Sequence, residues 1–210
     1  MSARAVGTER SAETRELILT AAERLFAEHG VHAVSDRRIG ARAGADVAAH
    51  FGSRAELVRA IVRRHAEPIE RSRARMVAVA GRGGDVWDWV ACLVRPFTEH
   101  LAASVGPSWY ARFGSRVMAE PPLRRVVVDE ALRGDHARRS VDEVARRLPA
   151  LPAAVRLERG AMTRHLVTHT CAERERALAT GAPTARSSWE DTATGLVAAI
   201  VGVWLAPVTS

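Results

Sequence analysis

The chain has 210 residues, which is enough to bury a substantial hydrophobic core without disulfide or metal staples. Its formal net charge of +7 suits a polyanionic partner, but all 31 basic residues are arginine, so a general arginine bias weakens that signal. Two distant cysteines argue against a disulfide framework. The polar N-terminus and the lack of a membrane-length apolar run predict a cytoplasmic protein with no membrane partner.

The first predicted helix begins at Thr14, a residue type suited to an N-cap, and ends at Gly30, a residue type that commonly terminates helices. Residues 1–12 before it form a polar arm. Arg4 and Arg10 of this arm either contact phosphate or the minor groove, or belong to a disordered terminus. The apolar face of the helix recurs at helical spacing and comprises Ile18, Ala21, Ala22, Leu25 and Phe26.

Two short segments follow the first helix. Ser35 is the predicted cap of a second helix, and Gly44 supplies the tight turn after it. Asp46 is the predicted cap of a very short third segment over residues 45–50, which Phe51 closes as a core anchor. Three helices with a glycine turn between the second and third describe a helix-turn-helix, whose third helix enters the DNA major groove.

A fourth helix follows this motif. Ser53 and Glu56 are spaced as a capping box for it. A bend is expected near Pro68, and the Gly-Arg-Gly-Gly run at 81–84 predicts a break and a domain boundary. The predicted apolar side of the helix comprises Leu57, Val58, Ile61 and Val62.

The first quarter to third of the chain resembles the DNA-binding domain of the TetR (tetracycline repressor) family of bacterial transcriptional regulators. The resemblance lies in the run LTAAERLFAEHGVHAVSDRRIGARAG, followed by HFGSRAEL. It implies an all-α protein in which residues 13–60 form a helix-turn-helix domain and residues 61–84 a linking helix and break. Residues 85–210 would then form a helical domain that binds a ligand and dimerises.

Phosphate contacts should dominate affinity in such a domain, and base contacts specificity. A helix N-terminus presents free N–H groups to phosphate, so residues at helix starts are candidates. By resemblance, the residue after HF-G-S is a basic phosphate contact, and Arg54 fills that place. The arginines of the second helix either contact DNA or form a solvated face. The candidate DNA-binding residues are Thr14, Arg15, Ser35, Arg37, Arg38, Asp46, Val47, Ala48, His50 and Arg54.

Two departures from the family pattern affect DNA reading. Only residues 45–49 separate Gly44 from His50, so the third helix is about three residues, or nearly one turn, shorter than usual and lacks a common tyrosine. Asp36 stands where relatives place an apolar residue, and Arg38 where they often have an acid, which removes half of a capping box. A regulator with altered operator reading, a degenerate regulator and a lesion in the sequence remain open.

From Asp85 onward the pattern is helical throughout, without an alternating β pattern. The first helix of this part carries an apolar stripe from Trp87 to Leu101 with a kink expected at Pro96. The other predicted helices run from about Gly106-Pro107 to Glu120, over 123–148 with an interruption near Gly134, over 153–179 and over 188–206.

The aromatic residues and methionines of this part are candidates for a small-molecule pocket, although most of them suit a hydrophobic core equally well. Trp87 and Trp89 cannot share one helix face, so at least one faces outward, into a pocket or towards a partner chain. His165 and His169 have a metal-compatible spacing, but the H-E-x-x-H glutamate is missing and we assign no metal. The candidate pocket residues are Trp87, Phe97, Trp109, Tyr110, Phe113, Met118, Met162, His165 and His169.

By resemblance, the last two helices pair with those of a second chain in a four-helix bundle. Packing within the chain is the alternative for their apolar residues. The candidate dimer-interface residues are Leu196, Ala199, Ile200, Val203 and Trp204.

These features predict a homodimeric TetR-like regulator, a repressor that a small hydrophobic or amphipathic inducer releases from a pseudo-palindromic operator on double-stranded DNA. The alternative is a dimeric small-molecule-binding helical protein whose DNA reading is impaired by the short recognition helix. The sequence contains no nucleophile elbow, phosphate loop, H-E-x-x-H or paired-carboxylate signature. We therefore expect no enzymatic activity and no cofactor.

Overall fold

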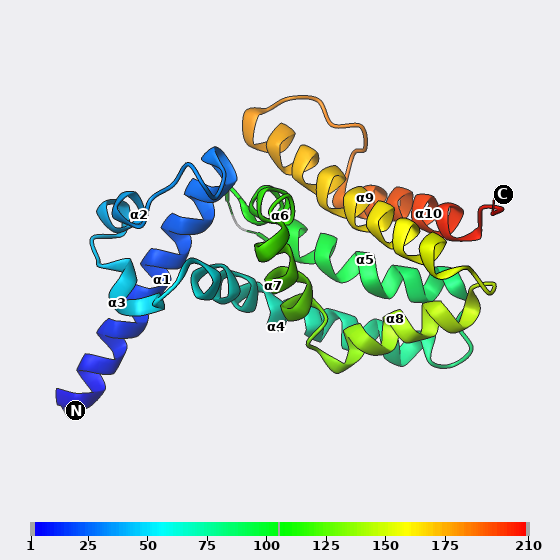
Figure 1. The fold of residues 1–210 in the computed structure, drawn as a ribbon, viewed down its shortest axis with the longest axis horizontal. Coiled ribbons are helices and arrows are strands. Elements are labelled where there is room, and N and C mark those ends of the chain that lie inside the picture. The colour runs from blue at the N-terminus through cyan, green and yellow to red at the C-terminus, as the bar shows by residue number, and fades with distance from the viewer. Residues whose placement is uncertain (1–2, 105, 209–210) are drawn as a thin grey trace.

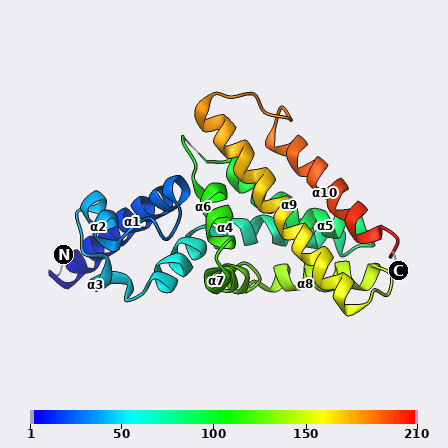
Figure 2. The ribbon, with the colours of Figure 1, turned by 45° about the horizontal axis from the view of Figure 1, so that its top comes forward.

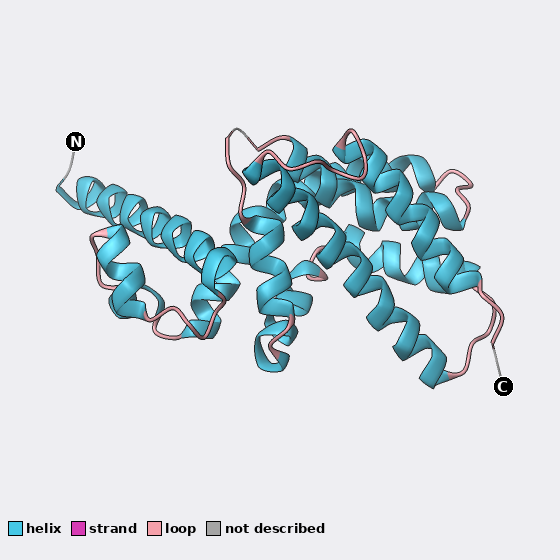
Figure 3. Cartoon of the chain, turned by 90° about the horizontal axis from the view of Figure 1, so that it is seen from above, coloured by secondary structure: helices cyan, strands magenta, loops and turns pink. Residues whose placement is uncertain are grey.

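A computed structural model describes residues 3–104 and 106–208, with side chains from Glu9 onward. Figure 3 shows that helices joined by loops make up this part of the chain, as the all-α prediction requires. No helix among the described residues is long and apolar enough to cross a membrane. The helices are α1 (Ala3–His29), α2 (Asp36–Ala43), α3 (Val47–Phe51), α4 (Arg54–Ala80), α5 (Val86–Ala102), α6 (Tyr110–Met118), α7 (Pro121–Ala131), α8 (Asp135–Arg147), α9 (Ala153–Thr180) and α10 (Trp189–Leu205).

The molecule is elongated, with α1, α2 and α3 at one end and α5, α8, α9 and α10 at the other (Figures 1 and 2). Helix α4 runs from the first group to the second, and α6 and α7 lie between them. The N-terminus therefore lies at the end formed by α1–α3, and the C-terminus at the opposite end.

Helix α1 begins earlier than predicted. It starts at Ala3 and continues through the expected polar arm, so Thr14 is not its N-cap. The Thr14 hydroxyl instead donates to the Arg10 carbonyl at 2.8 Å, inside the helix. Alanine, arginine and glutamate, which favour helices, dominate this stretch and explain the extension. Met1, Ser2 and the side chain of Arg4 lie outside the described part.

The caps of the next three helices are confirmed. Ser35 accepts from the Arg38 N–H at 3.2 Å, Asp46 from the Ala48 N–H at 3.0 Å, and Ser53 from the Glu56 N–H at 3.2 Å. The Glu56 carboxylate pairs with Arg59, so the predicted reciprocal half of its capping box is not made. Gly44 ends α2 with a φ of 69°, a left-handed conformation that favours glycine.

Two hydrophobic cores organise the molecule. The first is built from the predicted apolar faces of α1 and α4 together with Ile39 and Phe51, all buried. Phe113 and Val117 of α6 complete this core, although they follow the glycine run at 81–84 in the sequence. Each large apolar side chain buried in this way stabilises the fold by roughly 1.5–3 kcal/mol.

The second core lies around α5, which packs on α4, α8 and α10. Trp89 is its largest fully buried side chain, and Trp87 faces outward, so the expectation that one of the two does so is confirmed. Pro68 and Pro96 lie inside α4 and α5, which continue past them. The predicted interruption at Gly134 separates α7 from α8, and the predicted limits of α9 and α10 hold to within one residue.

Candidate nucleic-acid interface and ligand cavity

The short third helix has a very small outward surface. Val47 and Phe51, its first and last residues, stand four positions apart on one face and are buried in the core. Val47, predicted as a DNA contact, is therefore a core residue and does not face outward. Ala48 and Ala49 are exposed and His50 is half-buried, so two methyl groups and one imidazole form the side that a groove would meet.

Arg15 of α1 stabilises this short helix. Its Nη1 donates to the His50 carbonyl at 2.7 Å, and its guanidinium lies over the Phe51 ring at 4.2 Å from the centroid. A single-turn helix leaves most of its carbonyls without intrahelical partners, so this bond satisfies one of them. Arg15, predicted as a phosphate contact, is thus an internal brace in this structure.

Arg54 also makes its contacts within the chain. Its Nη2 pairs with Asp36 Oδ1 at 2.8 Å, and the guanidinium lies 5.1 Å from the centroid of the Phe26 ring. Asp36, the acidic departure from the expected pattern, therefore pairs with the arginine that was predicted to contact phosphate. Arg38 likewise contacts His29 at 2.8 Å. Arg37 and Arg42 of α2 are exposed, so they are the arginines of this helix best placed to form a basic surface.

A cavity of about 710 Å³ lies where α4, α5, α6, α7 and α9 meet. This volume falls within the range of about 300–1,000 Å³ typical of small-molecule sites. Four of the predicted pocket residues line it, namely Phe97, Tyr110, Phe113 and Met118. Sequence reasoning missed the α4 residues Arg63, Glu70 and Arg73, the α7 residues Val127 and Val128, and the α9 residues Thr163, Arg164, Val167 and Thr168.

The remaining pocket candidates lie elsewhere. Trp87 is 47% exposed, and Met162, His165 and His169 are exposed along α9. Trp109 lines a separate groove against α1 and α2. Helix α9 presents Thr163 and Val167 to the cavity, so the predicted α9 residues are one or two positions out of phase, which rotates them by about 100–200°. No group of three metal-ligating side chains occurs among the described residues.

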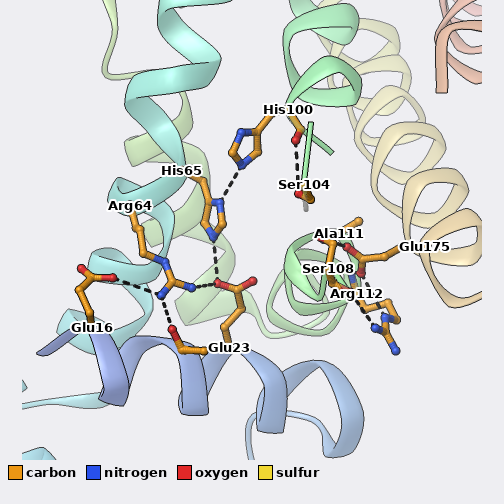
Figure 4. Close-up of polar contacts among 11 residues, drawn as sticks. Glu16, Glu23, Arg64, His65, His100, Ser104, Ser108, Ala111, Arg112 and Glu175 are labelled. Atoms are coloured by element: carbon orange, nitrogen blue, oxygen red, sulfur yellow. Dashed lines mark hydrogen bonds and ion pairs between the residues drawn. The ribbon is translucent and has the colours of Figure 1, made fainter. Parts of the chain in front are cut away.

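A polar cluster joins α1 to the cavity wall (Figure 4). His65 of α4 contacts Glu23 of α1 through Nε2 at 2.9 Å and His100 of α5 through Nδ1 at 2.7 Å. Arg64 also pairs with Glu23 and donates to Thr20 at 2.9 Å. The His65 ring stacks on Tyr110 with centroids 3.7 Å apart, and Tyr110 lines the cavity.

The charges of this cluster follow from its burial. Burial, and then the neighbouring His65, lower the pKa of His100 to about 4, so His100 is neutral near pH 7. Burial alone would raise the pKa of Glu23, but the hydrogen bond and charge of His65, followed by those of Arg64, lower it overall. Glu23 is therefore a buried carboxylate held between two donors. Neither it nor the histidines stood out in the sequence, because their partners are more than 30 residues away.

Glu175 of α9 fixes the start of α6 (Figure 4). Its carboxylate accepts from the Ser108 hydroxyl at 2.6 Å and from the backbone N–H groups of Ala111 and Arg112 at 3.1 and 2.9 Å. The Arg112 side chain adds a fourth bond through Nε at 3.1 Å. A negative charge at a helix N-terminus also complements the helix dipole. This clamp sets the position of Tyr110, the first residue of α6.

The predicted dimer face of α10 needs revision. Leu196 and Ile200 are buried in the second core of their own chain, and Trp204 donates from Nε1 to Thr163 at 2.9 Å. Val203 is half-buried. From Gly195 onward α10 is apolar on all sides, so its apolar pattern could not show which face is inward. The exposed residues at the start of this helix are polar, namely Glu190, Asp191 and Thr194, and those further along it are mainly small, namely Ala198, Ala199, Gly202 and Leu205.

The chain was compared with known protein families, curated proteins and solved structures. A solved structure of a TetR-family transcriptional regulator from Mesorhizobium loti MAFF303099 is 17% identical to the chain, with a TM-score of 0.49 over 94% of this chain and 99% of that one. A comparison with curated proteins yields no match. The profile for "Bacterial regulatory proteins, tetR family" matches residues 18–61, and that for "Tetracyclin repressor-like, C-terminal domain" matches residues 91–202. These two profiles together span most of the sequence, and the chain therefore belongs to the TetR family of DNA-binding, non-enzymatic transcriptional regulators.

Proposed function

We propose that this regulator is a homodimeric repressor, which a small molecule in the α4–α7 and α9 cavity releases from a pseudo-palindromic operator. The observation that carries the proposal is the continuity between the cavity wall and α1. Tyr110 lines the cavity and stacks on His65, which contacts Glu23 of α1. Phe113 gives a second connection, since it lines the cavity and stacks on Phe26 of α1 with centroids 6.3 Å apart.

Release follows from linkage between the two sites. A ligand that displaces the Tyr110 or Phe113 ring changes the packing under α1, and with it the orientation of α2 and α3. The ligand can weaken operator binding only by the factor by which its own affinity differs between the two states. A hundredfold change in DNA affinity corresponds to about 2.7 kcal/mol of differential ligand affinity.

Dimerisation is proposed to involve the outward faces of α9 and α10. Ala198, Ala199 and Gly202 form a flat strip on α10 that would let a second copy approach closely. Leu157 and Met162 of α9 are large, exposed apolar residues that a partner would cover. A two-fold dimer places its two DNA-binding heads, each formed by α1–α3, on half-sites about one helical turn of DNA apart.

A second candidate function is a dimeric small-molecule-binding protein with weak operator reading. The outward side of α3 favours it, because Ala48 and Ala49 offer only methyl groups, which leaves the half-buried His50 as the one side chain of that side able to hydrogen-bond to base edges. Arg37 and Arg42 could still supply phosphate contacts, which give affinity without sequence information.

Fluorescence anisotropy with DNA from upstream of its own gene, across a salt series, separates the two functions. A repressor should bind this DNA about a thousandfold or more tighter than random duplex, with a steep loss of affinity as salt rises. Equal affinity for both duplexes would contradict operator reading.

A variant then tests the cause. Three residues including a tyrosine, inserted between Ala49 and His50, should restore or tighten specific binding if the short helix limits reading. The matched control carries the same insertion between Gly181 and Ala182, in the loop after α9, and should bind DNA like the wild type.

A further inference from the structure

One arginine of the cavity is buried without a hydrogen-bond partner. Arg73 of α4 lines the cavity, and its side chain is only 8% exposed. Its Nε and Nη1 are both buried and make no hydrogen bond to any described residue. An arginine stays charged at any physiological pH, and burying a charge without hydrogen bonds is strongly unfavourable.

The neighbouring carboxylate does not satisfy Arg73. Glu70 Oε2 lies 3.6 Å from Nη1, too far for a hydrogen bond. The other oxygen, Oε1, accepts from the backbone N–H of His136 at 2.9 Å and lies 3.2 Å from its Nδ1. Burial consequently lowers the pKa of Arg73 even though Glu70 acts to raise it. Nη2 is not among the fully buried nitrogens and makes no hydrogen bond to a described residue, so it is the nitrogen of the guanidinium left for an acceptor in the cavity.

The other carboxylates around the cavity are already matched. Glu130 lies within 3.5 Å of Arg59, Arg63 and Arg133. Glu67 pairs with Arg71 at the surface. Arg73 is thus the buried charge of the lining that a bound molecule would complement, and the walls beside it are apolar, among them Leu93, Phe97 and Val128.

We propose that the cavity takes an amphipathic monoanion, a carboxylate on an apolar body, whose carboxylate accepts a hydrogen bond from Nη2 of Arg73. A hydrogen bond between a guanidinium and a carboxylate is charge-assisted and roughly twice as strong as a bond between neutral groups. Glu70, 3.6 Å from Arg73, disfavours the second charge of a phosphate monoester beside this guanidinium. This inference rests on the proposed function, because it names the ligand class of the same cavity.

Calorimetry on the full-length, DNA-free protein tests the assignment with three probes of equal chain length: octanoate, octan-1-ol and octyl phosphate. We expect octanoate to bind about tenfold or more tighter than octan-1-ol, the minimum for one buried charge-assisted pair. In Arg73→Met the preference should disappear, while the affinity for octan-1-ol stays within about twofold, which also shows that the variant is folded. Arg133→Met, at the cavity rim, should keep the preference.

Thermal unfolding of the ligand-free variants gives an independent readout. Removing an unsatisfied buried charge should leave Arg73→Met at least as stable as the wild type. A marked loss of stability would show that the pair with Glu70 is structural and would overturn the proposal. Equal binding of octanoate and octan-1-ol, no binding of either, or tighter binding of octyl phosphate would overturn it as well.

Neither experiment contains DNA, so the ligand class and operator release can fail separately. Selective octanoate binding without loss of DNA affinity would leave the carboxylate site standing and contradict induction alone.

Discussion

The hydrogen bonds of Glu175 to the start of α6 predict how much stability the protein loses when this side chain is removed. The Glu175 side chain is 4% exposed and its carboxylate accepts four hydrogen bonds, two of them from backbone N–H groups. Glu175→Ala removes the acceptor. The backbone N–H groups of Ala111 and Arg112 and the Arg112 guanidinium then lose their hydrogen-bond partner at a helix terminus that is shielded from water. Helix α6 has no side-chain cap of its own, so nothing nearby replaces the carboxylate.

The magnitude follows from these contacts. Breaking one partner out of a buried charged pair costs about 3–5 kcal/mol. In a protein of this size, 1 kcal/mol shifts the melting temperature by roughly 2–4 °C. We therefore expect Glu175→Ala to unfold roughly 6–20 °C below the wild type. Glu175→Gln keeps one acceptor oxygen but points an NH₂ group at N–H donors, and should lose a large part of the same stability.

Urea unfolding and thermal melts at one fixed protein concentration would measure the loss, because self-association would make the apparent stability depend on concentration. Glu173→Ala is the matched control, since Glu173 is exposed on the same helix two residues away, and it should stay within about 0.5 kcal/mol of the wild type. A loss below about 1 kcal/mol in Glu175→Ala would refute the clamp.

Three further changes have defined outcomes. In the folded protein the pKa of His100 is lowered from 6.5 to about 4, so its contribution to stability is complete above pH 6.5 and is lost as pH falls towards 4. His100→Gln should flatten the fall in melting temperature over that interval. Gly40→Ala places a Cβ 2.6 Å from the Ala45 carbonyl oxygen and should cost about 1–3 kcal/mol in denaturant unfolding. Arg15→Met should speed amide hydrogen exchange in α3 of the DNA-free protein by about tenfold, because the bond to the His50 carbonyl is lost.

Each of these changes has its own control. An equally steep acid loss in His100→Gln would contradict a neutral, buried His100. Gly114→Ala, at a helical glycine with no atom within 4 Å of the added carbon, should not destabilise the protein. Arg37→Met, at an exposed arginine of the neighbouring helix, should leave exchange in α3 unchanged; if both arginine variants speed it equally, Arg15 is not a specific brace.

Local sequence signals predicted the helices well. Ser35, Asp46 and Ser53 cap where expected because a cap depends on residues two or three positions away. The predicted start of α1 was wrong, since Thr14 is a residue type suited to a cap but follows a stretch rich in alanine, arginine and glutamate. Periodicity likewise identified α10 as apolar but could not tell that Leu196 and Ile200 face their own chain.

The candidate sites depended on contacts that a linear pattern does not contain. Arg15 and Arg54 were predicted to contact DNA from their positions in the sequence, yet they contact His50 and Asp36 of their own chain. Arg73 carries no motif, and its importance arises only because the fold buries it without a partner. Aromatic content found the α5 and α6 walls of the cavity, but the α9 wall is built from residues that have no such signature.

The shared core around α6 bears on how the chain can be divided and recombined. Phe26 of α1 stacks on Phe113, which in turn stacks on Tyr110 with centroids 6.1 Å apart. A fragment cut at the glycine run 81–84 would lose both rings and expose a bare apolar face on α1. Chimeric sensors that graft this head onto another effector domain would therefore need to carry α6 with it. The boundary between the two packing units of this protein is therefore set by the contacts of its aromatic rings. It does not coincide with a single cut in the sequence, because α6 packs with α1.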